Sequence, residues 1–164
     1  MSGFIATPPA PASPVGSTVA ADGWFPPIDV NSVRDTLRIG EGVVTHERLV
    51  AAIEGAMITA LRQLSAWRSA FAAAGFESLD QIDDVEIGGR KMTEVIWERI
   101  IRYYVAAEIA DLHRDLVVSD QANIRGENER LTADDYRRMA HHAVSDLLSI
   151  GAEKPVPRNR VSLL

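Results

Sequence analysis

The chain has 164 residues, 46% of them hydrophobic, with 17 basic and 23 acidic residues and a formal net charge of −6. This composition is that of a globular domain that can bury a core, and the negative balance argues against a protein whose affinity depends on phosphate contacts. The absence of cysteine excludes disulfides and thiolate metal sites.

Residues 1–22 form the first segment with a character of its own. They are small and mostly polar, and they include four of the eight prolines. We expect an arm that is flexible, or ordered only on a partner. The segment lacks the basic start and continuous apolar core of a secretory signal. The chain also has no run of about 18 apolar residues, so no membrane span is expected.

The prolines mark the limits of a helical body. All eight lie outside residues 28–154, and proline breaks helix interiors. We therefore expect an all-α fold, a small helical bundle with one long central helix, over residues 23–151. Residues 152–164 are expected to form an extended tail.

Two aromatic residues, Trp24 and Phe25, lie just before the first predicted helix. That helix is short, Asn31–Arg38, with Asp29 or Asn31 as its N-cap, and two glycines follow it. Trp24 and Phe25 have two possible roles. They cover the helical core as a lid, or they anchor a contact between subunits.

The central helix is predicted over His46–Ala74, with Thr45 as N-cap and Gly75 at its C-terminal end. Apolar residues recur at steps of three and four along it, which is the pattern of one buried helix face. The residues of this face are Leu49, Ile53, Met57, Ala60, Leu64, Trp67 and Phe71.

A second helix is predicted over Met92–Asp115, after a connector with a helical turn following Ser78 and a tight turn at Gly88 and Gly89. This helix carries two apolar faces, so it is expected to lie between neighbours. One face consists of Met92, Ile96, Ile100, Tyr103, Ala107 and Ala110, and the other of Trp97, Ile101, Tyr104, Val105 and Leu112.

The third helix is predicted to begin after Thr132, a good N-cap followed by acidic residues, and to run to Ile150, where Gly151 ends it. The polar segment before it has no clear helical pattern. The closing residues "VSLL" suit a strand or an apolar hook.

The residues that could support chemistry are few. His142 and Asp146 share a helix face, and His113 and Asp111 lie on another helix, but His141 and His142 diverge by about 100° and cannot easily hold one ion. The glycine pair before Arg90 lacks the spacing of a phosphate-binding loop. We expect no catalytic, cofactor or metal site.

Several segments together resemble one known family. They are "DGWFPPIDVNSVRDTLRI", "GVVTHERLVAAIEGAM", "LRQLSAWRSAFAAAGFESL", "IGGRKMTEVIWERIIRYYVAAEIADLHRD", "DDYRRMAHHAVSDLLSI" and "RNRVSLL". They are similar to the GPL family of phage head completion proteins, found in contractile-tailed phages and in prophages. The most specific pieces are the D-G-W-F-P entry and the L-x-A-W-R motif with the following A-G-F-x-S-L. The arm is longer and richer in proline than the family leads us to expect.

The resemblance implies a non-enzymatic head–tail connector subunit without a cofactor. Such a protein forms a ring of identical copies beneath the portal, stabilises the DNA-filled head and provides the docking surface for the tail. The implied partners are the portal protein and a tail completion or terminator protein, while packaged DNA passes through the lumen without specific binding. The implied location is the neck of the virion, after synthesis in the host bacterial cytoplasm.

Two interfaces follow from this picture. The second helix has more apolar surface than one partner helix covers, so a neighbouring copy is expected to cover the rest. The tail is expected either to dock on the portal, for instance as a strand added to an exposed sheet edge, or to fold back on its own subunit. The subunit interface is assigned to Trp24, Phe25, Trp97, Ile101 and Tyr104, and the portal interface to Arg158, Arg160, Val161, Ser162, Leu163 and Leu164.

Two other classes remain open at this stage. One is a small helical DNA-binding or packaging subunit of a phage, although the predicted helices are longer than those of a helix-turn-helix domain. The other is an unrelated helical scaffold whose arms bind a host protein.

Overall fold

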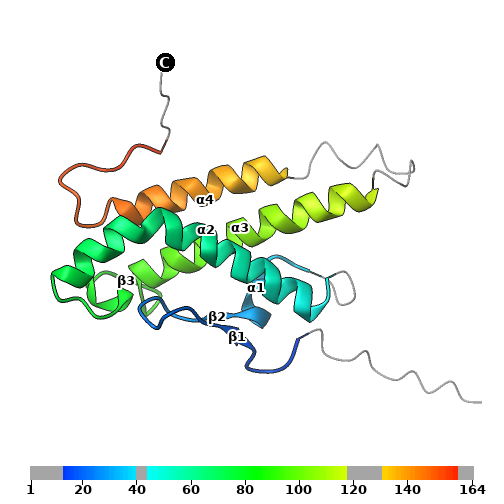
Figure 1. Cartoon of the computed structure of the whole chain (residues 1–164), viewed down its shortest axis with the longest axis horizontal. Helices are drawn as coiled ribbons and strands as arrows, with labels where there is room; N and C mark the ends of the chain where they lie inside the picture. Colours follow the sequence, from blue (N-terminus) through cyan, green and yellow to red (C-terminus); the bar gives the residue numbers. More distant parts are fainter. Residues whose placement is uncertain (1–12, 40–43, 118–130, 159–164) are drawn as a thin grey trace, which may run out of the picture.

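The computed structural model describes residues 13–39, 44–117 and 131–158, and for residues 113–117 only the backbone (Figure 1). Within these ranges the chain forms four α-helices, one 3₁₀ turn and two antiparallel two-stranded sheets. The fold is mostly helical, as expected, but the two small sheets depart from the all-α prediction. The elements are β1 (Thr18–Val19), β2 (Ile28–Asp29), α1 (Val30–Thr36), α2 (His46–Ala73), η1 (Leu79–Gln81), β3 (Glu86–Ile87), β4 (Arg90–Lys91), α3 (Met92–Val117) and α4 (Ala133–Leu148).

Helix α2 has the limits that its sequence predicts to within one residue. The Thr45 hydroxyl accepts a hydrogen bond from the Arg48 amide at 3.4 Å, which satisfies one of the free amides of the first turn. The chain leaves the helix through Gly75, whose φ of +97° is a conformation that glycine adopts at little cost. The buried face of α2 consists of Leu49, Ala52, Ile53, Ala56, Met57, Ala60 and Leu64.

By length and composition alone, α2 is also long and apolar enough to cross a membrane, with a mean hydropathy of 1.2. This was not anticipated from the sequence, because the expectation rested on a continuous run of apolar residues, which α2 lacks. The buried face of α2 belongs to the same core cluster as α3 and α4. Of the most apolar 18-residue stretch of α2, 39% is buried in this core, so packing inside the domain accounts for part of its apolar content.

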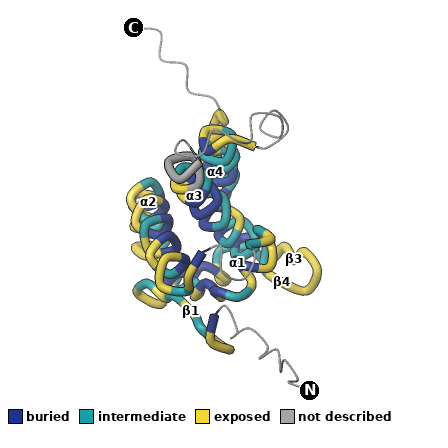
Figure 2. The backbone as a smooth tube through the Cα atoms, turned by 90° about the vertical axis from the view of Figure 1, so that its right-hand side faces the viewer, coloured by how far each residue is buried: buried dark blue, intermediate teal, exposed yellow. Residues whose placement is uncertain are grey.

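Helix α3 lies between two other helices of its own chain. It makes its most extensive contact with α4 and its next with α2, and α3 and α4 run side by side (Figures 1 and 2). Trp97, Ile100, Ile101 and Val105 are fully buried along it. The prediction that α3 lies between neighbours is confirmed for most of its length, and the covering segments belong to the same subunit, whereas Leu112 is 44% exposed.

The segment before α1 is part of the folded body from Ser13 onward. Strand β1 pairs with β2, and the Val30 amide donates to the Ser17 carbonyl at 3.0 Å. The buried side chain of Arg34 donates to the Ser13 hydroxyl at 3.3 Å and to the Val44 carbonyl at 3.0 Å. The expected boundary at residue 22 therefore falls inside the body, and residues 1–12 lie outside the described ranges.

The connector between α2 and α3 contains a hairpin. Strands β3 and β4 are joined by Gly88 and Gly89, whose φ angles of +61° and +76° suit the tight turn that matches strand twist. The turn itself was predicted, and η1 confirms the predicted helical turn after Ser78. In Figure 2 the hairpin projects from the body and is coloured as exposed.

Candidate functional site

One end of the body is held by a group of six aromatic residues, which we call the aromatic end: Trp24, Phe25, Trp67, Phe71, Phe76 and Trp97. Each tryptophan donates its indole N–H to a backbone carbonyl of a distant segment at 3.1 Å. The acceptors are the carbonyls of Phe76, Ile150 and Pro26. Large apolar area and satisfied indole donors together fix the N-terminal segment, α2, α3 and the end of α4 relative to one another.

The residues that the sequence pattern assigns to a subunit interface lie inside a single copy. Trp24, Phe25, Trp97, Ile101 and Tyr104 are exposed by 8% or less. Phe25 stacks on Trp97 with ring centroids 4.3 Å apart, so the N-terminal segment covers the face of α3 that a second copy was expected to cover. This assignment is corrected: Trp24 and Phe25 form the lid over the core, and the set offers almost no surface to a neighbour.

The histidines of α4 have different surroundings. The His141 ring contacts Tyr104, with its Nδ1 3.4 Å from the hydroxyl, and Gln63 donates to the same hydroxyl at 2.6 Å. Burial raises the pKa of Tyr104, and the hydrogen bond from Gln63 opposes that shift. The carboxylate of Asp146, the expected partner of His142, instead accepts from Arg158. In the described part of the chain no three His, Asp or Glu side chains are grouped as metal ligands.

The end of α4 and the first part of the tail form a fixed unit, which we call the tail root, residues 149–158. Val156 donates its amide to the Ser149 hydroxyl at 2.8 Å, and Arg158 donates from Nη2 and Nε to Asp146 Oδ1 at 2.8 and 3.1 Å. Of the residues assigned to the portal interface, Arg158 thus binds its own subunit. The others, Arg160, Val161, Ser162, Leu163 and Leu164, lie outside the described residues.

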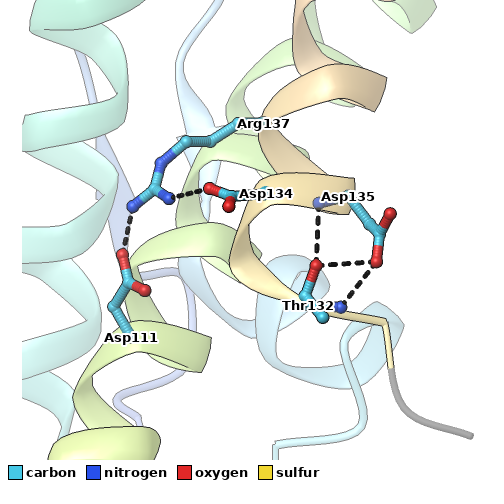
Figure 3. Close-up of polar contacts among 5 residues, drawn as sticks. All are labelled: Asp111, Thr132, Asp134, Asp135 and Arg137. Carbon is cyan, nitrogen blue, oxygen red and sulfur yellow. Dashed lines mark hydrogen bonds and ion pairs between the residues drawn. The ribbon is translucent and has the colours of Figure 1, made fainter. Parts of the chain in front are cut away.

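The opposite end of the body, where α3 finishes and α4 begins, is polar (Figure 3). Thr132 and Asp135 form a reciprocal capping box, in which each side chain accepts from the other residue's amide. Thr132 is the main cause of the lowered pKa of Asp135. Arg137 binds Asp134 at 2.8 Å and also pairs with Asp111 across the two helices. We call these five residues the polar end.

Exposed apolar side chains identify surfaces that the sequence did not single out. Val85 and Ile87 are 51% and 53% exposed on the β3–β4 hairpin, and Ile58 is 55% exposed on the outer side of α2. The alternation D-V-E-I before two glycines is a hairpin signal that could have placed the first pair. Ile58 could not have been separated from the neighbouring buried face, because helical spacing alone does not fix the width of that face.

The family model for the phage head completion protein (GPL) matches residues 19–154, a range that includes the four helices of the described residues. No curated protein and no solved structure matches the chain. The matched family is a structural one that acts in phage head assembly. The match covers most of the chain, and the protein therefore belongs to the family of phage head completion proteins (GPL).

Proposed function

We propose that this head completion protein is a head–tail connector subunit, which forms a ring beneath the portal, stabilises the DNA-filled head and provides the docking surface for the tail. The family match over residues 19–154 carries the proposal. The partners are further copies of the chain, the portal protein and the tail completion or terminator protein. The protein acts in the neck of the virion after synthesis in the host cytoplasm, and it needs no cofactor.

A closed ring requires that one patch on each copy meets a different patch on the next. Because the aromatic residues first assigned to this contact are buried, the ring contact must use other surfaces. Ile58 on α2 and the pair Val85 and Ile87 on the β3–β4 hairpin are exposed at separate places in the fold. We assign the contact between copies to these two patches, with the hairpin of one copy on α2 of the next.

Portal docking is assigned to Arg160–Leu164, which follow the tail root in the sequence. Apolar residues at 161 and 163 alternate with Ser162, a pattern that suits a strand added to an exposed sheet edge. A ring carries one such tail per copy, so weak single contacts add up to a durable joint.

The charge of the chain suits a channel that DNA passes through without adhering. With a net charge of −6, the ring repels the phosphate backbone more than it attracts it. Binding of DNA that falls steeply with added salt would instead support a DNA-binding or packaging subunit.

The portal assignment is tested by deleting Val161–Leu164. The matched control is Leu131→Ser, which removes an exposed apolar side chain, 48% exposed, near the other end of α4. We expect the deletion to abolish association with purified portal rings and DNA retention in assembled heads, while the control keeps both. Truncated subunits that still join portal rings and keep heads filled would refute the docking role of the tail.

A further inference from the structure

We propose that Arg158 is a positioning residue: it holds the tail root against α4, so that the portal-docking residues leave every copy from one fixed point. The inference rests on the proposed docking of the tail on the portal. It differs from a direct contact between Arg158 and the portal, which the sequence pattern had suggested.

The first support is the way the tail returns to the helix that precedes it. Arg158 reaches back 12 positions to Asp146, to which it donates two hydrogen bonds of 2.8 and 3.1 Å. Val156 donates its amide to the Ser149 hydroxyl at 2.8 Å, and that hydroxyl donates to the Ser145 carbonyl at 2.6 Å. The guanidinium also lies near the negative end of the α4 dipole, where a cation is favoured.

The second support is that the same root is tied to α2. The Trp67 indole donates to the Ile150 carbonyl at 3.1 Å. Gly151 lies so close to Phe71 that a Cβ atom there would be 2.7 Å from the ring. The start of the tail is therefore fixed by two helices, and its exit point is defined relative to the whole body.

The consequence concerns the entropy of docking. Each residue that becomes ordered on binding lowers the affinity, and a segment already held in place avoids that cost. With the root fixed, residues 152–158 are already in place before docking. If the clamp is released, these residues must become ordered on binding. The ion pair is partly exposed, so we expect a moderate effect for each copy, about two- to fivefold in affinity.

The experiment measures the affinity of the full-length protein for purified portal rings in a double-mutant cycle of Asp146→Ala and Arg158→Ala. We expect each single variant to weaken binding by about two- to fivefold, because each releases the same clamp. The double variant should be no weaker than either single one. The exchanged pair Asp146→Arg with Arg158→Asp should restore most of the affinity.

The matched control is Glu153→Gln, which removes one negative charge from an exposed residue of the same segment and leaves the pair intact. It should leave the affinity unchanged. Hydrogen exchange of the Val156 amide should be faster in both single variants, while the melting temperature stays close to that of the parent. A role confined to folding stability would not produce this pattern.

Two results would overturn the inference. Unchanged affinity in Asp146→Ala with a loss in Arg158→Ala would mean that Arg158 contacts the portal itself. Equal affinity in all variants would mean that the clamp has no role in docking. Deletion of Val161–Leu164 distinguishes these two results from a failure of the proposed function. If the deletion leaves the affinity for the portal intact, the tail does not dock on the portal, and the role proposed for Arg158 is refuted as well.

Discussion

The aromatic end and the polar end of the body are stabilised by different interactions. At the aromatic end, rings and indole donors from four segments of the chain meet, and Phe25 and Trp97 are almost completely buried. At the polar end, a capping box and the pair of Arg137 with Asp134 lie within the first turns of α4, and Arg137 also pairs with Asp111 of α3 (Figure 3). The first set depends on the tertiary fold, whereas most of the second is local in sequence.

This difference indicates where the subunit tolerates change. Burial of large side chains supplies most of the stability of a domain, whereas exposed ion pairs and single caps contribute about 1 kcal/mol or less each. The tail root begins at the aromatic end, next to Trp67 and Phe71. The segment proposed to dock on the portal therefore follows the more firmly packed end of the body.

The largest effect is expected when a ring is removed from the aromatic end. Phe25→Ala should lower the free energy of unfolding by about 3–5 kcal/mol, because it leaves a cavity against Trp97 and Trp24. Its control is Leu112→Ala, which truncates an apolar side chain, 44% exposed, near the polar end and should cost about 0.5 kcal/mol. Similar losses for both in urea denaturation would contradict the contrast between the two ends.

A smaller effect is expected from Gly151→Ala, where the tail leaves α4. Gly151 and Gly89 both have positive φ, +79° and +76°, but only Gly151 has a ring within reach of an added Cβ atom. Gly89→Ala should cost about 1 kcal/mol for the backbone conformation alone, and Gly151→Ala about 2–4 kcal/mol because Phe71 must also move. Equal changes in melting temperature for the two variants would show that the contact with Phe71 does not add to the cost of Gly151→Ala.

The helices were the most predictable part of the fold. Thr45 and Thr132 are the N-caps of α2 and α4, as the sequence predicts, and α3 begins at Met92. These features are local, because a cap and a periodic apolar face are specified by residues a few positions apart.

What covers each apolar face could not be predicted in the same way. Periodicity showed that α3 has a second apolar face but gave no information about the segment that packs on it. The covering segment lies far away in the sequence: the Trp97 indole binds the Pro26 carbonyl 71 positions away. The same limit applies to the tail root, where the bond between Arg158 and Asp146 depends on a reversal of the chain after α4.

A small effect is predicted for the capping box at the polar end. Thr132→Ala should destabilise the protein by about 1 kcal/mol at neutral pH, since it leaves the Asp135 amide without its acceptor, while Thr132→Ser should retain the cap. Because Asp135 is part of the same box, the two residues are coupled and their effects should not add.

The pH dependence of this box has a definite sign. Hydrogen bonds from Thr132 hold the pKa of Asp135 below its ordinary value, so the carboxylate is favoured in the folded state. Its contribution is complete above the ordinary pKa of an aspartate and is lost as the pH falls through the lowered value. Glu47 at the start of α2 also has a lowered pKa, because of hydrogen bonds from its backbone and from Thr45. Both carboxylates therefore contribute to the pH dependence of stability, and the quantity to measure is the difference in stability between variant and parent.

Asp135→Asn should be less stable than the parent at pH 7, and this difference should shrink on acidification. It should also shrink when Thr132 is already alanine, and a difference that is independent of pH would mean that the carboxylate charge has no part in the cap.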